Sequence, residues 1–216
     1  MTPEYPSGPA GGRPQTASRP AIAIGWRDTV TAVAQTATIF TLTVDLADMD
    51  RGVYQTLDLR VARHPSETAG YMLVRVLAYC LEYQEGIELT DGVSSGDEPA
   101  VLVRDLTGRI TAWIEVGMPD ANRLHRGSKL AGRAAVYTHR DARQLLAQLS
   151  GEKIHRAADI PIYAFDRNVI EELSALIGRR ASLALSVTDR EIYFSIGDRN
   201  VTLPIVEHRI AGAPGG

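Results

Sequence analysis

The strand-to-helix turn of this chain reads Trp113-Ile114-Glu115-Val116-Gly117-Met118-Pro119-Asp120. The apolar residues at its start predict a strand, the Gly and Pro end that strand, and Asp120 is a suitable N-cap for a following helix. A short hairpin precedes the turn and begins at Asp97-Glu98-Pro99. Acidic groups from two neighbouring strands are therefore expected near the start of a helix. We expect this turn to form the centre of both the fold and its functional site.

Outwards from this turn, hydrophobic periodicity predicts an ordered series of strands and helices. The order helix, three strands, helix, strand between Ser66 and Thr138 predicts an α/β (α+β) fold, with a mixed β-sheet and flanking helices. The expected strands are residues 36–46, 53–61, 87–90, 100–104, 110–116, 134–138, 160–165, 181–187, 191–196 and 200–203, and the expected helices are residues 66 to 83–86, 121–132, 141–149 and 166–177.

Composition is that of a globular protein, with 216 residues, 44% hydrophobic and 23% charged. The first twenty residues contain five prolines and lack the apolar centre of a signal peptide. We expect residues 1–32 to be a poorly ordered extension, residues 33–207 a single domain, and residues 208–216 a flexible tail. No apolar run approaches the roughly 18 residues of a spanning helix, so no membrane segment is predicted. The lack of a signal-peptide pattern and the single cysteine predict a cytoplasmic location.

The numbers of cysteines and of charged residues limit the kinds of functional site that this chain can form. Cys80 is the single cysteine, which excludes a disulfide framework and a cysteine-based zinc site, and its spacing places it on the buried side of a helix. Residues 121–143 contain six Arg or Lys residues and one Asp, a net charge of +5 in a chain whose net charge is −3. This basic block predicts either an anion-facing patch or an ordinary solvated helix face.

The pairing register of the hairpin determines which acidic side chains can lie close to one another. A two-residue loop at Thr107-Gly108 places Glu115 opposite Ala100, with Glu98 one diagonal away at about 7–8 Å on the same face. Strict alternation places Asp97 on the other face, although a bend at the following proline would turn it inwards. The choice between Asp97 and Glu98 stays open at this point.

Glu115 with Asp97 or Glu98 would supply hard oxygen ligands for Mg²⁺ or Mn²⁺, an ion that activates water against a phosphodiester. Glu115 ends an apolar stretch, where a carboxylate needs a partner or an ion. Glu67 is a further candidate ligand, although first-turn acids are ordinary capping residues. The alternative is that these acids form ion pairs with arginines.

Five segments, in this order along the chain, resemble the signature segments of the YaeQ family, a functionally uncharacterised bacterial family. They are residues 36–39, 45–51, 63–68, 97–99 and 113–120. The family's fold is described as a variant of the PD-(D/E)XK nuclease-like superfamily. The resemblance therefore implies a restriction-endonuclease-like αβββαβ core with extra N-terminal and C-terminal strands. It also implies that Asp97 and Glu115 are the motif acids and Glu67 the acid of the first core helix.

The resemblance departs from the superfamily at Gly117, where the motif lysine should stand. The chain has two lysines, and Lys129 lies roughly 12 Å along the helix that starts at Ala121, a long reach back to Glu115. Arg126 and Lys129 are the candidate catalytic cations. The candidate phosphate-binding residues are Arg123, His125, Arg126 and Lys129.

Three functions follow from these patterns. The first is a Mg²⁺- or Mn²⁺-dependent phosphodiesterase that acts on nucleic acid. The second is a catalytically inactive nuclease-like scaffold that binds nucleic acid or a protein partner. The third is a protein-interaction domain in which the acids pair with arginines. Gly117 favours the second function, and the retained acids favour the first.

Overall fold

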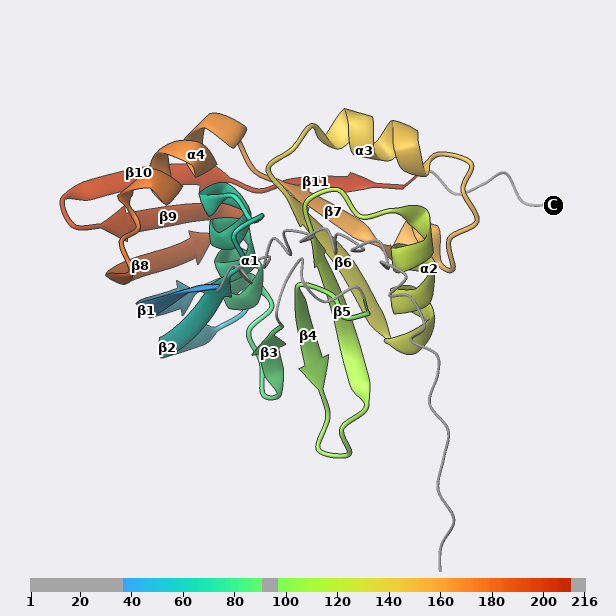
Figure 1. Ribbon diagram of the computed structural model, residues 1–216, viewed down its shortest axis with the longest axis horizontal. Coiled ribbons are helices and arrows are strands. Elements are labelled where there is room, and N and C mark those ends of the chain that lie inside the picture. The colour runs from blue at the N-terminus through green and yellow to red at the C-terminus, as the bar shows by residue number, and fades with distance from the viewer. Residues whose placement is uncertain (1–36, 91–96, 211–216) are drawn as a thin grey trace, which may run out of the picture. The chain divides into compact units, whose positions relative to one another are not determined.

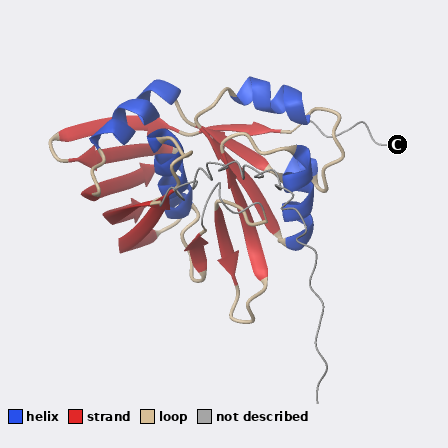
Figure 2. Cartoon of the chain, viewed as in Figure 1, coloured by secondary structure: helices blue, strands red, loops and turns tan. Residues whose placement is uncertain are grey.

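The structure is a computed structural model that describes residues 37–90 and 97–210 (Figure 1). Contacts divide the chain into residues 1–34 and residues 35–216, and every described residue belongs to the second unit. The predicted extension at residues 1–32 and most of the predicted tail therefore lie outside the described residues. Within them the fold contains two mixed sheets and four α-helices (Figure 2).

The first sheet, called sheet A, collects the strands from the two ends of the domain. Its order is β10-β9-β8-β1-β2, and only β1 and β8 run parallel. Buried residues alternate with exposed ones along β1, because one face of the sheet covers the core. The strands are β1 (Thr38–Asp48), β2 (Val53–Arg63), β8 (Arg180–Thr188), β9 (Glu191–Ile196) and β10 (Arg199–Pro204).

The second sheet, sheet B, contains the strand-to-helix turn and has the order β11-β7-β6-β5-β4-β3. Strands β5, β6 and β7 run parallel to one another, whereas β3, β4 and β11 are antiparallel to their neighbours. The strands are β3 (Ile87–Leu89), β4 (Val101–Arg104), β5 (Ile110–Val116), β6 (Arg133–Thr138), β7 (Pro161–Ala164) and β11 (Val206–Arg209).

Helices cover both faces of sheet B. Helix α1 (Ala69–Leu81) lies between the two sheets and is buried on most of its sides, and α4 (Arg167–Leu176) packs beside it. Helices α2 (Ala121–Leu130) and α3 (Ala142–Leu149) cover the opposite face of sheet B. A short 3-10 helix, Ala157–Asp159, precedes β7.

Sheet B has a different core on each face. The larger core includes Ile114, Val116 and the apolar stripe of α1, together with the inner face of sheet A. The smaller one includes Leu124 of α2, Leu145 of α3 and Val136 of β6. Because successive residues of a strand point to opposite faces, this division decides which side of the sheet each functional residue reaches.

The predicted order of elements is confirmed, including the αβββαβ series from α1 to β6. The N-cap of α1 differs from the expectation at Ser66. Thr68 is the N-cap and accepts a hydrogen bond from the Tyr71 backbone at 3.1 Å, while the Ser66 hydroxyl lies 2.6 Å from His64 Nδ1. β11 was not predicted, and it extends the ordered chain to Arg209, two residues past the expected domain end at 207.

The predicted register of the hairpin is confirmed at the end away from its turn, where Val101 pairs with Ile114. The turn differs from the expected two-residue loop. The register shifts between Val103 and Arg104, and the loop closes through a 3.0 Å hydrogen bond from the Asp105 backbone N–H to the Arg109 carbonyl. The shift lies near the turn, so the pairing of Val101 with Ile114 at the other end of the strands keeps the expected register.

The β1–β2 turn connects three elements through its side chains. The Asp50 carboxylate accepts hydrogen bonds from the backbone N–H groups of Asp189 and Arg190, at 2.8 and 3.0 Å. Arg51 donates to the carbonyls of Leu81 and Tyr83 at the end of α1. These contacts give the Asp-Met-Asp-Arg sequence a structural role at the junction of sheet A and α1.

Among the described residues, no helix has the length and apolarity needed to cross a bilayer. Cys80 is buried, and burial raises the pKa of its thiol to about 12. This agrees with the predicted core position and keeps the thiol protonated at neutral pH.

Candidate functional site

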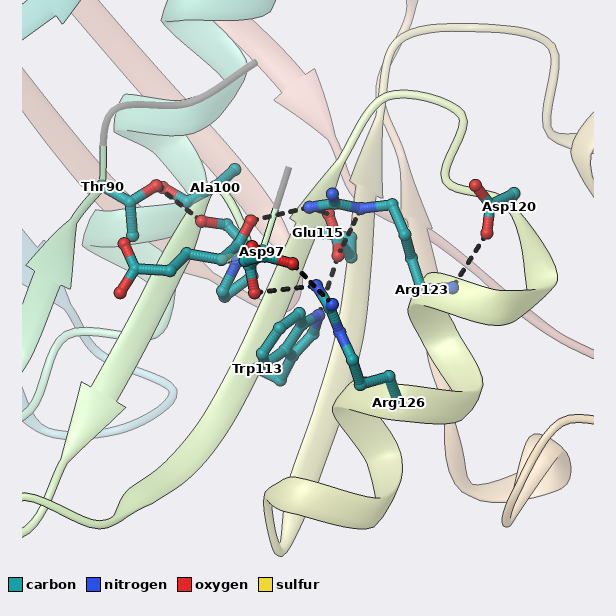
Figure 3. Close-up of polar contacts among 10 residues, drawn as sticks. Thr90, Asp97, Ala100, Trp113, Glu115, Asp120, Arg123 and Arg126 are labelled. Carbon is teal, nitrogen blue, oxygen red and sulfur yellow. Dashed lines mark hydrogen bonds and ion pairs between the residues drawn. The ribbon is translucent and has the colours of Figure 1, made fainter. Parts of the chain in front are cut away.

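The side chains of Trp113 and Glu115 point towards α2 (Figure 3). They alternate along β5 with Ala112, Ile114 and Val116, which belong to the core on the α1 side. A buried tryptophan suits a strand position with a helix packed over it, and Trp113 is 1% exposed. The strand thus places one carboxylate beneath the basic helix.

Both oxygens of the Glu115 carboxylate accept hydrogen bonds. Oε1 accepts from Trp113 Nε1 at 2.8 Å and from Arg123 Nε at 3.0 Å, and Oε2 accepts from a terminal nitrogen of Arg123 at 3.2 Å. The Glu115 side chain is 4% exposed and that of Arg123 is 27% exposed. A carboxylate at this depth is costly without a partner, and the guanidinium supplies one.

The two open candidates, Asp97 and Glu98, take different directions. Asp97 Oδ1 accepts from a terminal nitrogen of Arg126 at 2.9 Å, so Asp97 reaches the α2 side (Figure 3). The Glu98 side chain pairs with Arg104 at 3.2 Å, whereas its backbone carbonyl accepts from Arg123 at 2.7 Å. Of the two acids, Asp97 shares the arginine cluster of α2 with Glu115.

Glu67 has a separate partner. Both of its oxygens accept hydrogen bonds from one nitrogen of Arg75, at 3.1 and 3.2 Å, and both side chains are fully buried. Arg75 also donates to the carbonyls of Ala62 and Thr90, which fastens α1 to β2 and to the segment after β3. The sequence interpretation missed Arg75, although an arginine between Val74 and Val76 on an apolar helix signals a buried ion pair.

The four basic candidate residues of α2 point in different directions. Arg123 and Arg126 face the acids, and the Arg126 guanidinium lies 5.5 Å from the Trp113 ring centroid. His125 Nδ1 lies 3.0 Å from the Lys153 carbonyl, which turns the imidazole towards the loop after α3. Lys129 is exposed near the end of the helix. Arg126 and Lys129 are three residues apart and therefore share one side of α2.

These ion pairs determine whether the four acids could bind the expected Mg²⁺ or Mn²⁺ ion. Asp97, Glu98, Glu115 and Glu67 each pair with a different arginine, and no group of three or more His, Cys, Asp or Glu residues suited to a metal ion occurs in residues 37–90 and 97–210. Metal ligands need free carboxylate oxygens that converge on one point. In this arrangement the donor set does not fit a metal ion, because guanidinium groups hold the oxygens.

Gly117 has a structural reason to lack a side chain. Its φ is +88°, and a Cβ built there would lie 3.2 Å from Cε2 of Tyr71. Its backbone N–H donates to the Tyr137 carbonyl at 2.8 Å, which holds the end of β5 against β6. A lysine at this position would need a left-handed backbone and a shift of the Tyr71 ring. Burial raises the pKa of Tyr71 to about 12, so its phenol stays protonated.

Comparison with known proteins gives one consistent family. The model of the family described as "YaeQ protein" matches residues 33–205. The chain is 32% identical over 170 residues to the "Uncharacterized protein YaeQ" of Escherichia coli (strain K12), covering 78% of this chain and 94% of that protein. It is 30% identical over 174 residues to the protein of that name from Salmonella typhi, covering 80% of this chain and 96% of the relative.

Solved structures agree with this match. The crystal structure of the YaeQ protein from Xanthomonas axonopodis pv. citri has a TM-score of 0.73 and 30% identity, covering 82% of this chain and all of that chain (100%). The YaeQ protein from Pseudomonas syringae has a TM-score of 0.72 and 29% identity, covering 83% of this chain and 98% of that chain. By sequence and by fold, this chain belongs to the YaeQ family.

Proposed function

We propose that this domain binds nucleic acid through its phosphate groups, without a metal ion and without cleavage. In this proposal the domain keeps a nuclease-like scaffold of the PD-(D/E)XK type, and the exposed side of α2 forms the contact. The proposal combines the expected phosphate-binding helix with an acidic site whose oxygens are held by arginines.

The observation that carries the proposal is the exposed ion pair between Arg126 and Asp97. Its side chain is 41% exposed, and its carboxylate partner, Asp97, is 94% exposed. An ion pair in this setting is weak, because water screens both charges. The Trp113 ring, 5.5 Å from the guanidinium, supports the arginine whether or not Asp97 holds it. A phosphate can therefore replace the Asp97 carboxylate, while Arg126 keeps its 2.8 Å hydrogen bond to the Asp97 carbonyl. Lys129 lies on the same side of the helix.

The buried half of the site argues for binding rather than hydrolysis. Glu115 is the acid that a metal-dependent mechanism most needs, and Arg123 and Trp113 occupy both of its oxygens. Freeing those oxygens for a metal would leave the Arg123 charge without its carboxylate in a partly buried position. Gly117 also lacks the side chain that would assist the attacking water.

Fluorescence anisotropy with labelled single-stranded RNA, single-stranded DNA and duplex DNA tests the proposal, in EDTA and at several salt concentrations. We expect binding that weakens as salt rises, because phosphate contacts release counterions. Arg126→Ala and Lys129→Ala should each weaken binding and lower the salt slope by about one. Arg199→Ala, which removes an exposed, paired arginine of sheet A, is the control. Absence of binding at low salt, or equal affinity of all variants, would contradict the proposal.

The second candidate is the Mg²⁺- or Mn²⁺-dependent phosphodiesterase. The convergence of Asp97 and Glu115 on neighbouring arginines of one helix favours it, because both acids lie at the same end of sheet B. Titration of Mn²⁺ by calorimetry, together with a nuclease assay on the same nucleic acids, decides between the two. Mn²⁺ binding that Glu115→Ala abolishes, combined with cleavage, would replace the first proposal with the second.

A further inference from the structure

A concave region lies at the carboxyl ends of the parallel strands. It is an open cleft of about 550 Å³. Gly117 and Met118 follow β5, Arg140 follows β6, and Arg167 follows β7 in lining it. Ligands of α/β sheets bind outside the carboxyl ends of the strands, so the cleft occupies the position where such a fold places a ligand.

The residues that line the cleft also lie at or near the amino-terminal ends of the four described α-helices. Tyr71 lies in the first turn of α1, and Met118 lies three residues before α2. Asp141 is the N-cap of α3, and Arg167 is the first residue of α4. Helix dipoles direct partial positive charge to these ends, so the surroundings favour an anion.

The cleft offers side-chain hydrogen-bond donors that have no partner within the part of the chain that the structure describes. Among the described residues, the Arg140 guanidinium, the Tyr71 hydroxyl and the side-chain amide of Gln144 make no hydrogen bond, and Arg140 makes no ion pair. Gln148 lies one turn beyond Gln144 on α3 and lines the same cleft. Donors that approach from three elements suit a group with several acceptor oxygens.

Two acidic side chains could compete for the donors of the cleft, Asp141 in its lining and Glu171 as the partner of Arg167, and both already have partners. Asp141 Oδ1 accepts from the backbone N–H groups of Arg143 and Gln144, at 2.8 and 3.4 Å, as the cap of α3. Glu171 pairs with Arg167 at 2.7 Å, with both side chains more than half exposed. Such an exposed pair is weak, so Arg167 can turn to a ligand. Arg140 keeps a full positive charge facing the cleft.

We propose that this cleft binds a phosphate monoester group. Its oxygens would accept from Arg140, from Tyr71 and from Gln144, with Arg167 at the far wall. The inference uses none of Arg123, Arg126 or Lys129, so it does not rest on nucleic-acid binding by α2. The monoester can belong to a small phosphorylated molecule or to the phosphorylated end of a nucleic acid, and the chemistry recognised is the same.

Calorimetry on the full chain tests this inference with inorganic phosphate, adenosine monophosphate, adenosine, and a short oligonucleotide with and without a terminal phosphate. We expect adenosine monophosphate to bind and adenosine not to bind. Arg140→Ala should weaken binding about tenfold, the effect of losing a charge-assisted hydrogen bond. Arg143→Ala is the matched control, an exposed arginine of α3 that does not line the cleft, and should change the affinity less than about twofold.

Each outcome is informative. Three results would overturn the inference. The first is equal binding of adenosine and adenosine monophosphate, and the second is no binding of inorganic phosphate or adenosine monophosphate at about ten millimolar. The third is an unchanged affinity for adenosine monophosphate in Arg140→Ala. Gln144→Ala provides a second variant, and circular dichroism checks that both variants fold. If Lys129→Ala reduces nucleic-acid binding while the monophosphate still binds normally, the two sites are separate. If no nucleic acid binds but the monophosphate does, the function proposed for α2 fails and the cleft stands.

Discussion

The ring of Trp113 lies against the backbone of Gly127, so closely that a Cβ at Gly127 would be 2.3 Å from Trp113 Cδ1. This contact sets the distance between β5 and α2. The same indole donates to Glu115 and lies beneath Arg126. The absence of a side chain at one helical position thus allows the whole arginine cluster to sit over the strand.

Gly127→Ala should therefore lower the free energy of unfolding by about 1–3 kcal/mol, because overpacking exceeds the gain in helix propensity. Urea denaturation followed by tryptophan fluorescence measures the change. Gly70→Ala in α1 is the comparison, since its nearest contacts are at 3.3 Å, and it should stay within about 1 kcal/mol of the parent chain. Equal stability of both variants would show that α2 can move away from β5.

The Glu115–Arg123 pair should be coupled in stability. In a double-mutant cycle of Glu115→Ala and Arg123→Ala, we expect a coupling free energy of about 1–3 kcal/mol, because the carboxylate is buried. The partly exposed Glu98–Arg104 pair is the control, with an expected coupling of about 0–1 kcal/mol. Chemical denaturation of the four chains of each cycle gives these values. A negligible coupling for Glu115 would mean that its carboxylate is available to another ligand.

Restoring the motif lysine should not restore nuclease chemistry. Gly117→Lys is expected to lower stability by about 1–2 kcal/mol, because φ at this position is +88°. We expect no cleavage of DNA or RNA in Mn²⁺ by this variant. Gly132→Ala is the control, since its nearest neighbour is the Thr111 carbonyl at 3.8 Å. Cleavage gained by Gly117→Lys would support a dormant metal site and count against the metal-free proposal.

Asp50 should matter for stability despite its exposure. It binds the backbone of Asp189 and Arg190, two consecutive non-glycine residues with φ of 52° and 62°. Such conformations persist where neighbouring contacts hold them. Asp50→Ala should cost about 1–2 kcal/mol in thermal or urea unfolding. Asp58→Ala, which removes an exposed hydrogen bond to Thr43 on the same sheet, should cost about 0.5 kcal/mol.

His139 should make stability depend on pH. Burial, with a smaller contribution from Arg140, lowers its pKa from 6.5 to about 4, and the imidazole is 3% exposed. The unfolded chain therefore takes up the proton first as pH falls. The stability from this group is complete above about pH 6.5 and declines towards pH 4, by about 2 kcal/mol at pH 5.

Urea denaturation at about pH 7.5 and about pH 5 measures this decline. In His139→Gln the difference between the two pH values should shrink, because the titrating group is gone. His155→Gln is the control, since His155 is exposed and should leave the difference unchanged. A pH dependence that is the same in all three chains would mean that other groups, including the carboxylates, cause it.

Local pattern determined the elements of this fold. Alternation predicted β1 and β2, and the apolar stripe with Met72 and Leu73 predicted α1, because burial of one face repeats with the geometry of the element. The hairpin arithmetic also gave the register of Val101 with Ile114 correctly. β11 was missed, because its four residues have intermediate or full exposure and no alternating apolar pattern. The N-cap of α1 was misplaced, since Ser66 and Thr68 are both good capping residues.

The partners of the acids could not be predicted in the same way. The direction of Asp97 depends on a bend before Pro99, and the partner of Glu67 depends on how α1 sits between two sheets. Strict alternation placed Glu98, not Asp97, on the face of Glu115, and only the backbone bend before Pro99 brings Asp97 to Arg126 instead. The metal expectation followed from residue type and spacing alone. It could not include the arginines that the packing of α2 and α1 brings to each carboxylate.

By itself, the sequence determined the series of strands and helices, their register around the central turn and the family, because these follow from short-range periodicity and from ordered motifs. Tertiary structure alone decided that each predicted acid meets an arginine, and that four helix ends and Arg140 share one cleft. Those relationships join side chains of different segments, most of them only six to eight positions apart but across a bend or a turn, and the packing of helices on both faces of sheet B brings them together.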